Sequence, residues 1–322
     1  MGGVFFNDAL GSGGRLGLSG VVTPDSGPDL AYGAVSIDQP LGGDGLRLFA
    51  TASYSATRPS QALRALDTEG KALNVEAALS YPLIRSRDLN LLLRGGFAWR
   101  DVRSENAIVV PLFDDHVRSL ELGVYANALD RWGGYSTAQA TLVQGLSLFG
   151  ATSKSAPDKS HATASGVFTR LDVEATRQQP LSDQISLLVG AGGQTAFNGS
   201  LLASEQYSIG GYNYGRAFDP ADATGDSALA GRVELQWTPV FRPQGLSGLQ
   251  PYTFYEHGQV WQAQPPLGTP TSQTLVSAGL GLRFTLLGRI NSDLQWAYPL
   301  GPGLGGAVPR RGRVFFSVNT NF

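Results

Sequence analysis

The chain has 322 residues, 42 of them glycine, with a formal net charge of -2 and no cysteine. The missing cysteines exclude a disulfide framework, thiolate metal sites and redox chemistry based on thiols. The near-neutral charge gives no sign of nucleic-acid binding, which normally needs a strongly basic patch.

Apolar and polar residues alternate with a period of two along the whole chain. Between residues 45 and 57, for example, Leu46, Leu48 and Ala50 alternate with Arg47 and Thr51. Such segments predict β-strands with one apolar and one polar face. In chain order, the predicted strands are 3–9, 14–23, 29–39, 45–57, 71–82, 89–102, 117–129, 135–147, 166–179, 184–197, 227–238, 250–262, 274–286, 290–299 and 313–322.

The length and polarity of these strands favour a membrane barrel over a soluble sandwich. Many reach roughly 10 residues, the length of a tilted membrane-spanning strand, whereas ordinary strands average about 5 to 6. Full charges on the polar faces suit a water-filled lumen and would be very costly inside a sandwich. These charged residues include Arg94, Arg170, Asp172, Glu174, Arg232, Glu234, Arg283 and Asp293. We therefore predict an all-β fold, a transmembrane antiparallel β-barrel.

The connections between the predicted strands alternate between short turns and longer polar loops, as periplasmic turns and extracellular loops do in such barrels. Fifteen strands is an odd number in a class whose bacterial members have even numbers. We therefore expect sixteen strands in the parent protein, with about fifteen present here. Residues 1–322 are then the C-terminal transmembrane β-barrel domain of a longer chain, without its first strand.

One long loop has an unusual composition. Residues 208–235 read SIGGYNYGRAFDPADATGDSALAGRVEL, and the first two-thirds gather glycine, aspartate and aromatic residues around Arg216. About forty residues later, Phe254 and Glu256 lie two apart on a predicted strand and so share a face. That face should point into the lumen, because an acid facing lipid is costly. On these residues alone, the simpler interpretation is an exposed loop arginine and an unrelated luminal acid.

Together the two stretches resemble the sixth-loop and partner-strand motifs of two-partner secretion transporters, the haemolysin and filamentous-haemagglutinin secretion-activation family. The resemblance covers the whole chain and implies that the loop folds back into the lumen, where Arg216 forms an ion pair with Glu256, a glutamate in place of the usual aspartate. The residues that carry the resemblance are Gly215, Arg216, Ala217, Phe218, Asp219, Gly225 and Asp226 in the loop, Phe254, Glu256 and Gly258 in the partner strand, and Phe316, Val318 and Phe322 in a C-terminal barrel-assembly signal.

The resemblance implies an outer-membrane pore that moves an unfolded exoprotein client from the periplasm to the cell surface. The other expected partners are outer-membrane lipid and lipopolysaccharide, and the barrel-assembly machinery during biogenesis. The N-terminal POTRA domains of the family are expected to be absent from residues 1–322. Two alternatives remain open: an outer-membrane protein assembly or insertion factor of the same superfamily, and a passive diffusion porin.

Catalytic signals are weak. The three histidines, His116, His161 and His257, are scattered, and no spacing places one beside a nucleophile. His257 adjoins Glu256, but neighbours on a strand face opposite ways. The sequence also has no phosphate-binding loop. We therefore expect no enzymatic activity, no cofactor, no metal site and no nucleic-acid partner.

Overall fold

The computed structural model describes residues 2–23, 30–58, 67–212, 214–241, 244–265, 267–303 and 311–320. Within these ranges, fifteen strands form one sheet and two short strands form a separate hairpin. No helix in the same ranges is long and apolar enough to cross a membrane.

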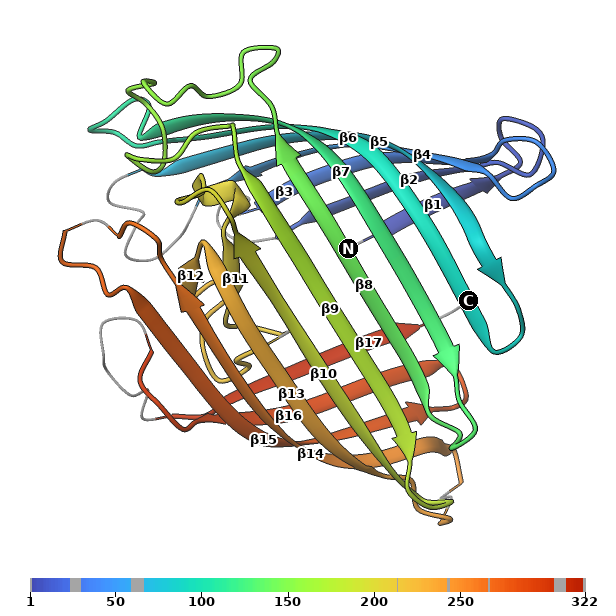
Figure 1. Ribbon diagram of the computed structural model, residues 1–322. Coiled ribbons are helices and arrows are strands. Elements are labelled where there is room, and N and C mark those ends of the chain that lie inside the picture. The colour runs from blue at the N-terminus through green and yellow to red at the C-terminus, as the bar shows by residue number, and fades with distance from the viewer. Residues whose placement is uncertain are drawn as a thin grey trace. The chain divides into compact units, whose positions relative to one another are not determined.

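Each of the fifteen predicted strands is present in the large sheet (Figure 1). They are β1 (Gly2–Asn7), β2 (Arg15–Val22), β3 (Leu30–Pro40), β4 (Arg47–Thr57), β5 (Glu69–Arg85), β6 (Leu89–Glu105), β7 (Phe113–Leu129), β8 (Tyr135–Gly145), β9 (Thr169–Pro180), β10 (Ile185–Ala196), β13 (Ser227–Trp237), β14 (Leu246–Trp261), β15 (Ser272–Leu286), β16 (Ile290–Pro299) and β17 (Arg313–Thr320).

Two strands, β7 and β14, begin four residues earlier than the alternation predicts. β7 starts at Phe113 rather than at residue 117, and β14 starts at Leu246 rather than at residue 250. At the start of β7, the charged Asp114 and Asp115 hide the pattern, although Asp115 is fully buried and accepts a hydrogen bond from the Ser160 amide. At the start of β14, Gly248 weakens the strand signal, since glycine is depleted in strands.

Strands follow one another across the sheet in chain order, except that β10 pairs with β13 because β11 and β12 lie in the loop between them. All the neighbouring pairs whose register is described are antiparallel, as consecutive strands joined by short turns must be. The register places Glu256 of β14 opposite Ser277 of β15 on one side and Arg232 of β13 on the other. The sixteenth strand and the upstream domains stay predictions.

The two faces of the strands carry different side chains, as the alternation predicts. On β13, Val233 and Leu235 are exposed, whereas Glu234 and Gln236 are buried. This is the reverse of a soluble protein, where large apolar side chains are covered and acids are not. An exposed apolar face that recurs on strand after strand marks a surface that lipid covers.

Backbone contacts divide the chain into two compact units. Unit 1 comprises Met1–Tyr125, Ala140–Leu171 and Ala196–Glu205, and unit 2 comprises Ala126–Gln139, Asp172–Thr195 and Gln206–Phe322. Each has its own buried apolar cluster, around Phe168 in unit 1 and around Phe218 and Phe254 in unit 2. The loop between β10 and β13 therefore contributes its first residues, up to Glu205, to unit 1 and the rest, with Arg216, to unit 2.

An arginine placed on the apolar face should destabilise the fold in lipid. Ala52 is exposed on β4, where it pairs with Val35 and Val75, and Ser53 beside it faces the other way. We expect Ala52→Arg to lower the free energy of unfolding in lipid vesicles by about 2 kcal/mol, because a charge on the lipid face loses its hydration. Ser53→Arg is the matched control and should cost far less. Urea titration measures both, and equal losses would contradict this assignment of the faces.

Candidate functional site

The loop that carries Arg216 contains a short hairpin. Its strands are β11 (Tyr207–Ile209) and β12 (Ala223–Gly225), with Tyr207 opposite Gly225 and Ile209 opposite Ala223. Figure 1 shows the hairpin beside β13, and both strands contact β14 as well. Ile209 is buried against Gly258, where a Cβ would lie only 3.1 Å from the Ile209 side chain. The hairpin therefore packs on the polar face of the sheet.

Glycines make possible the tight turns within the long segment that joins β11 to β12. Gly210 and Gly215 both have positive φ, 107° and 89°, a region that other residues rarely adopt. A side chain at Gly210 would also collide with the backbone carbonyl of Asp219. A hydrogen bond from the Gly210 amide to the Tyr214 carbonyl closes the first turn. Another, from the Phe218 amide to the Gly215 carbonyl, closes the second. These bonds fix the backbone at Gly215 and direct the side chain of Arg216 toward the polar faces of the strands, which form the wall.

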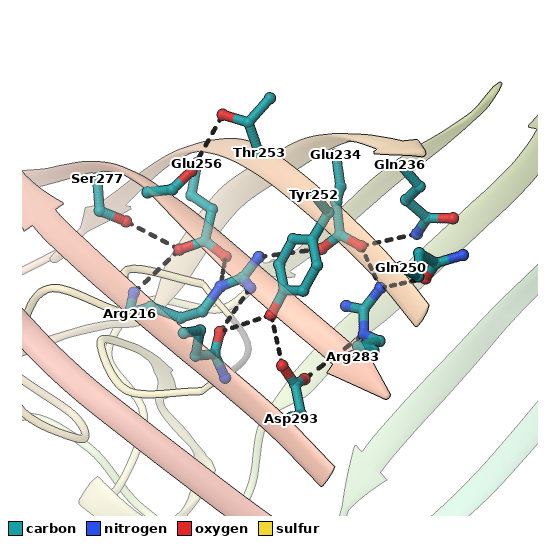
Figure 2. Close-up of polar contacts among 12 residues, drawn as sticks. Arg216, Glu234, Gln236, Gln250, Tyr252, Thr253, Glu256, Ser277, Arg283 and Asp293 are labelled. Carbon is teal, nitrogen blue, oxygen red and sulfur yellow. Dashed lines mark hydrogen bonds and ion pairs between the residues drawn. The ribbon is translucent and has the colours of Figure 1, made fainter. Parts of the chain in front are cut away.

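The structure brings Arg216 of the loop and Glu256 of β14 into contact (Figure 2). The Arg216 Nε donates to one carboxylate oxygen of Glu256 at 2.6 Å. The other oxygen accepts from the backbone amides of Gly215 and Arg216, at 3.0 and 2.9 Å, and from the Ser277 hydroxyl at 2.8 Å. Glu256 is fully buried, so these donors replace all the hydration that its carboxylate has lost.

The guanidinium of Arg216 has three further contacts. Its Nη1 donates to the Gln295 side-chain oxygen at 2.8 Å, and its Nη2 lies 3.7 Å from a carboxylate oxygen of Glu234. Its central carbon lies 3.6 Å from the centre of the Phe254 ring, a cation–π geometry. The Phe254 ring occupies the space that a side chain at Gly279 would fill. The partner-strand residue Phe254 thus forms the surface on which the guanidinium lies.

A second ion pair continues the network toward β16 (Figure 2). Arg283 of β15 donates to Glu234 at 2.6 Å and lies 3.5 Å from a carboxylate oxygen of Asp293. The Tyr252 hydroxyl donates to Asp293 at 2.8 Å, and the Arg283 guanidinium lies over the Tyr252 ring. Arg216 and Arg283 therefore balance the charges of Glu256 and Glu234, and Asp293 joins on the more accessible side.

The remaining loop-motif residues have different surroundings. Ala217 and Phe218 are buried in the apolar cluster of unit 2. Asp226 is buried and accepts from the Ala263 amide at 2.8 Å and from the Gln206 side chain at 3.2 Å. Gly225 lies so close to the backbone of β14 that a side chain would not fit. Asp219, in contrast, is exposed and pairs with Arg313 of β17 at 2.7 Å.

The predicted barrel-assembly signal is not part of this network. Phe316 and Val318 are exposed on β17, on the side expected to face lipid. Phe322 lies outside the described residues. Sequence reasoning also missed Glu234 and Gln295 as partners of Arg216, and Arg283 as the partner of Glu234. It identified Glu234 and Arg283 as charges on polar faces, but only the strand register brings Glu234 near both arginines.

Comparison with known proteins identifies relatives. The model of the family described as haemolysin secretion/activation protein ShlB/FhaC/HecB matches residues 15–284, well over half of the chain. The outer membrane transporter CdiB of Dickeya dadantii is 28% identical over 174 residues, which are 54% of this chain and 26% of that protein.

Solved structures show the same fold. CdiB from Escherichia coli has a TM-score of 0.81 at 23% identity, covering 98% of this chain and 58% of its own. CdiB from Acinetobacter baumannii has a TM-score of 0.72 at 16% identity, with coverages of 99% and 55%. BamA from Haemophilus ducreyi, lacking POTRA domains 1–3, has a TM-score of 0.66 at 16% identity, with coverages of 98% and 66%. The predicted barrel fold is confirmed, and the chain spans less than two-thirds of the length of each of these relatives.

Loss of the Glu256 carboxylate should weaken the fold around the loop. Glu256→Ala leaves Arg216 buried without its main partner, and we expect the free energy of unfolding to fall by about 3 kcal/mol or more. Ser277→Ala is the matched control, because it removes only one donor to the same carboxylate and should cost about 1 kcal/mol. Denaturant titration in lipid vesicles measures both. A loss for Glu256→Ala no larger than that for Ser277→Ala would refute the central place given to the carboxylate.

Proposed function

This chain belongs to the haemolysin secretion/activation family, and we propose that it forms the outer-membrane pore through which an unfolded exoprotein partner passes from the periplasm to the cell surface. Family membership places it in the bacterial outer membrane. The observation that most supports the proposal is the buried contact of Arg216 with Glu256, which holds a long loop against the polar face of the strands. In a membrane barrel, that face lines the lumen.

The chemistry of this contact suits a loop that has to be held at one place. A buried ion pair contributes little net stability compared with an apolar contact, because both charges lose their hydration. It fixes geometry instead, since the loop fits only where its guanidinium and two amides meet Glu256 and Gln295. A loop held in this way keeps the lumen occupied and moves away from the wall when its polar contacts are replaced by water or by a passing chain.

We propose that the polar faces of the strands form the export route for the client. Acids and arginines alternate in this network, as with Glu234 between Arg216 and Arg283, so they leave no large field of one sign along the wall. An unfolded chain of mixed composition therefore meets a hydrated surface without a strong preference. The sequence contains no phosphate-binding loop, and we propose export without nucleotide hydrolysis.

Two other functions remain as alternatives. The first is an outer-membrane protein assembly factor, but the likeness to BamA supports the fold alone and does not favour that function. The family match favours secretion instead. A passive diffusion porin has no need of a loop anchored through four strands of the wall. Lipopolysaccharide and the barrel-assembly machinery are proposed partners during insertion of the protein into the membrane.

Arg216→Ala should release the loop tip and raise channel activity. We expect a several-fold rise in open probability in planar bilayers, because the guanidinium is one end of the ion pair and the partner of Gln295. In cells that co-express the exoprotein partner, the same variant should secrete less of it, since the loop no longer returns to one position.

Arg313→Ala is the matched control for this variant. It also removes an arginine that pairs with the loop, but its partner Asp219 is exposed and the pair is worth little. Conductance and secretion should therefore stay close to those of the unmodified protein. Normal gating and normal secretion by Arg216→Ala would rule out the proposed role of the loop and would favour a simple porin.

A further inference from the structure

The first part of the same loop is held at a separate place, in unit 1. Leu201 and Leu202 are fully buried in the apolar cluster with Val117 and Phe168. The short 3-10 helix η2 (Ala203–Glu205) follows, and the Ala203 amide donates to the Ser160 hydroxyl at 2.8 Å. The segment therefore lies against the strands and against the neighbouring loop, and it ends with an acid.

That acid, Glu205, is fully buried between two arginines of the polar face. Arg100 of β6 donates to one carboxylate oxygen, and Arg170 of β9 lies 3.4 Å from the other. Arg170 also donates to the backbone carbonyl of Glu205 at 2.9 Å, and Arg100 donates to Asn74 of β5 at 3.0 Å. The side chain and the backbone at residue 205 are thus both fixed to the wall.

We propose that Glu205 is a second positioning residue of the loop, which holds its leading segment as Arg216 holds its tip. The signs of the charges are reversed between the two anchors. At the tip, a loop arginine meets acids of the wall, whereas at Glu205 a loop acid meets arginines of the wall. The inference rests on the proposed function, because it takes the position of the loop to control passage through the pore.

The reversal of charge makes the position of the loop specific. If the segment slid along the wall, Glu205 would approach acids such as Glu76 and Glu121, which share the polar faces of β5 and β7. A buried acid among acids is unfavourable, so the segment that ends at Glu205 is held at one place on the strands of unit 1. Full release of the loop then requires both contacts to break, and their effects on opening should add as free energies.

The test compares single-channel open probability in planar bilayers for the whole protein and six variants. Glu205→Gln keeps the shape of the side chain and removes its charge, and we expect open probability to rise about tenfold. The matched control is Asp158→Asn, which removes a charge from an exposed loop residue and should change nothing. Arg216→Ala is the reference, and its combination with Glu205→Gln should multiply the two increases.

A rescue variant separates a positioning role from a general loss of stability. Glu205→Arg combined with Arg100→Glu and Arg170→Glu restores opposite charges at both contacts of residue 205, and open probability should return toward that of the unmodified protein. Glu205→Asp keeps the charge on a side chain one methylene shorter and should lie between the unmodified protein and Glu205→Gln. All variants are compared only as folded barrels, checked by heat-modifiable migration in SDS gels.

The outcomes separate this inference from the proposed function. If Arg216→Ala raises open probability and Glu205→Gln behaves like Asp158→Asn, the second anchor does not exist. Failure of the charge exchange to rescue gating would also overturn it. If Arg216→Ala itself leaves gating unchanged, the proposed role of the loop fails first, and the second anchor fails with it.

Discussion

A fully buried carboxylate on the wall, that of Glu256, determines how the loop is built. An acid in that position needs donors from every side, and the neighbouring strand supplies only the Ser277 hydroxyl. The other donors come from the loop, which therefore has to bend sharply at Gly215 and present two backbone amides together with a guanidinium. The positive φ of Gly215, which few other residues adopt, follows from that requirement.

The strands were predictable because their pattern is local. Apolar and polar residues alternate regardless of which strand is the neighbour, so all fifteen strands could be located from the sequence. The start of β7 could not, because Asp115 reads as a loop residue until its burial against Ser160 is known. The hairpin β11–β12 was also missed, since strands of three residues carry too little alternation to detect.

The site was only partly predictable for the opposite reason. Motif resemblance pointed to Arg216 and Glu256, but it gave no sign of Gln295 or of the Glu234–Arg283 pair. Those contacts depend on how far each strand is shifted against the next, which the turns and the register decide. Small residues add a further condition, because Gly279 and Gly281 of β15 leave the space in which the rings of Phe254 and Tyr252 lie.

The amide contacts of Glu256 make the two ends of the anchor unequal. Two of its three loop donors belong to the backbone, so any residue at position 216 that preserves the turn still offers them. A change on the wall side, in contrast, removes the acceptor for all three donors at once. The wall thus recognises the shape of the loop backbone as well as its arginine, and loss of the acid removes more of the contact than loss of the guanidinium.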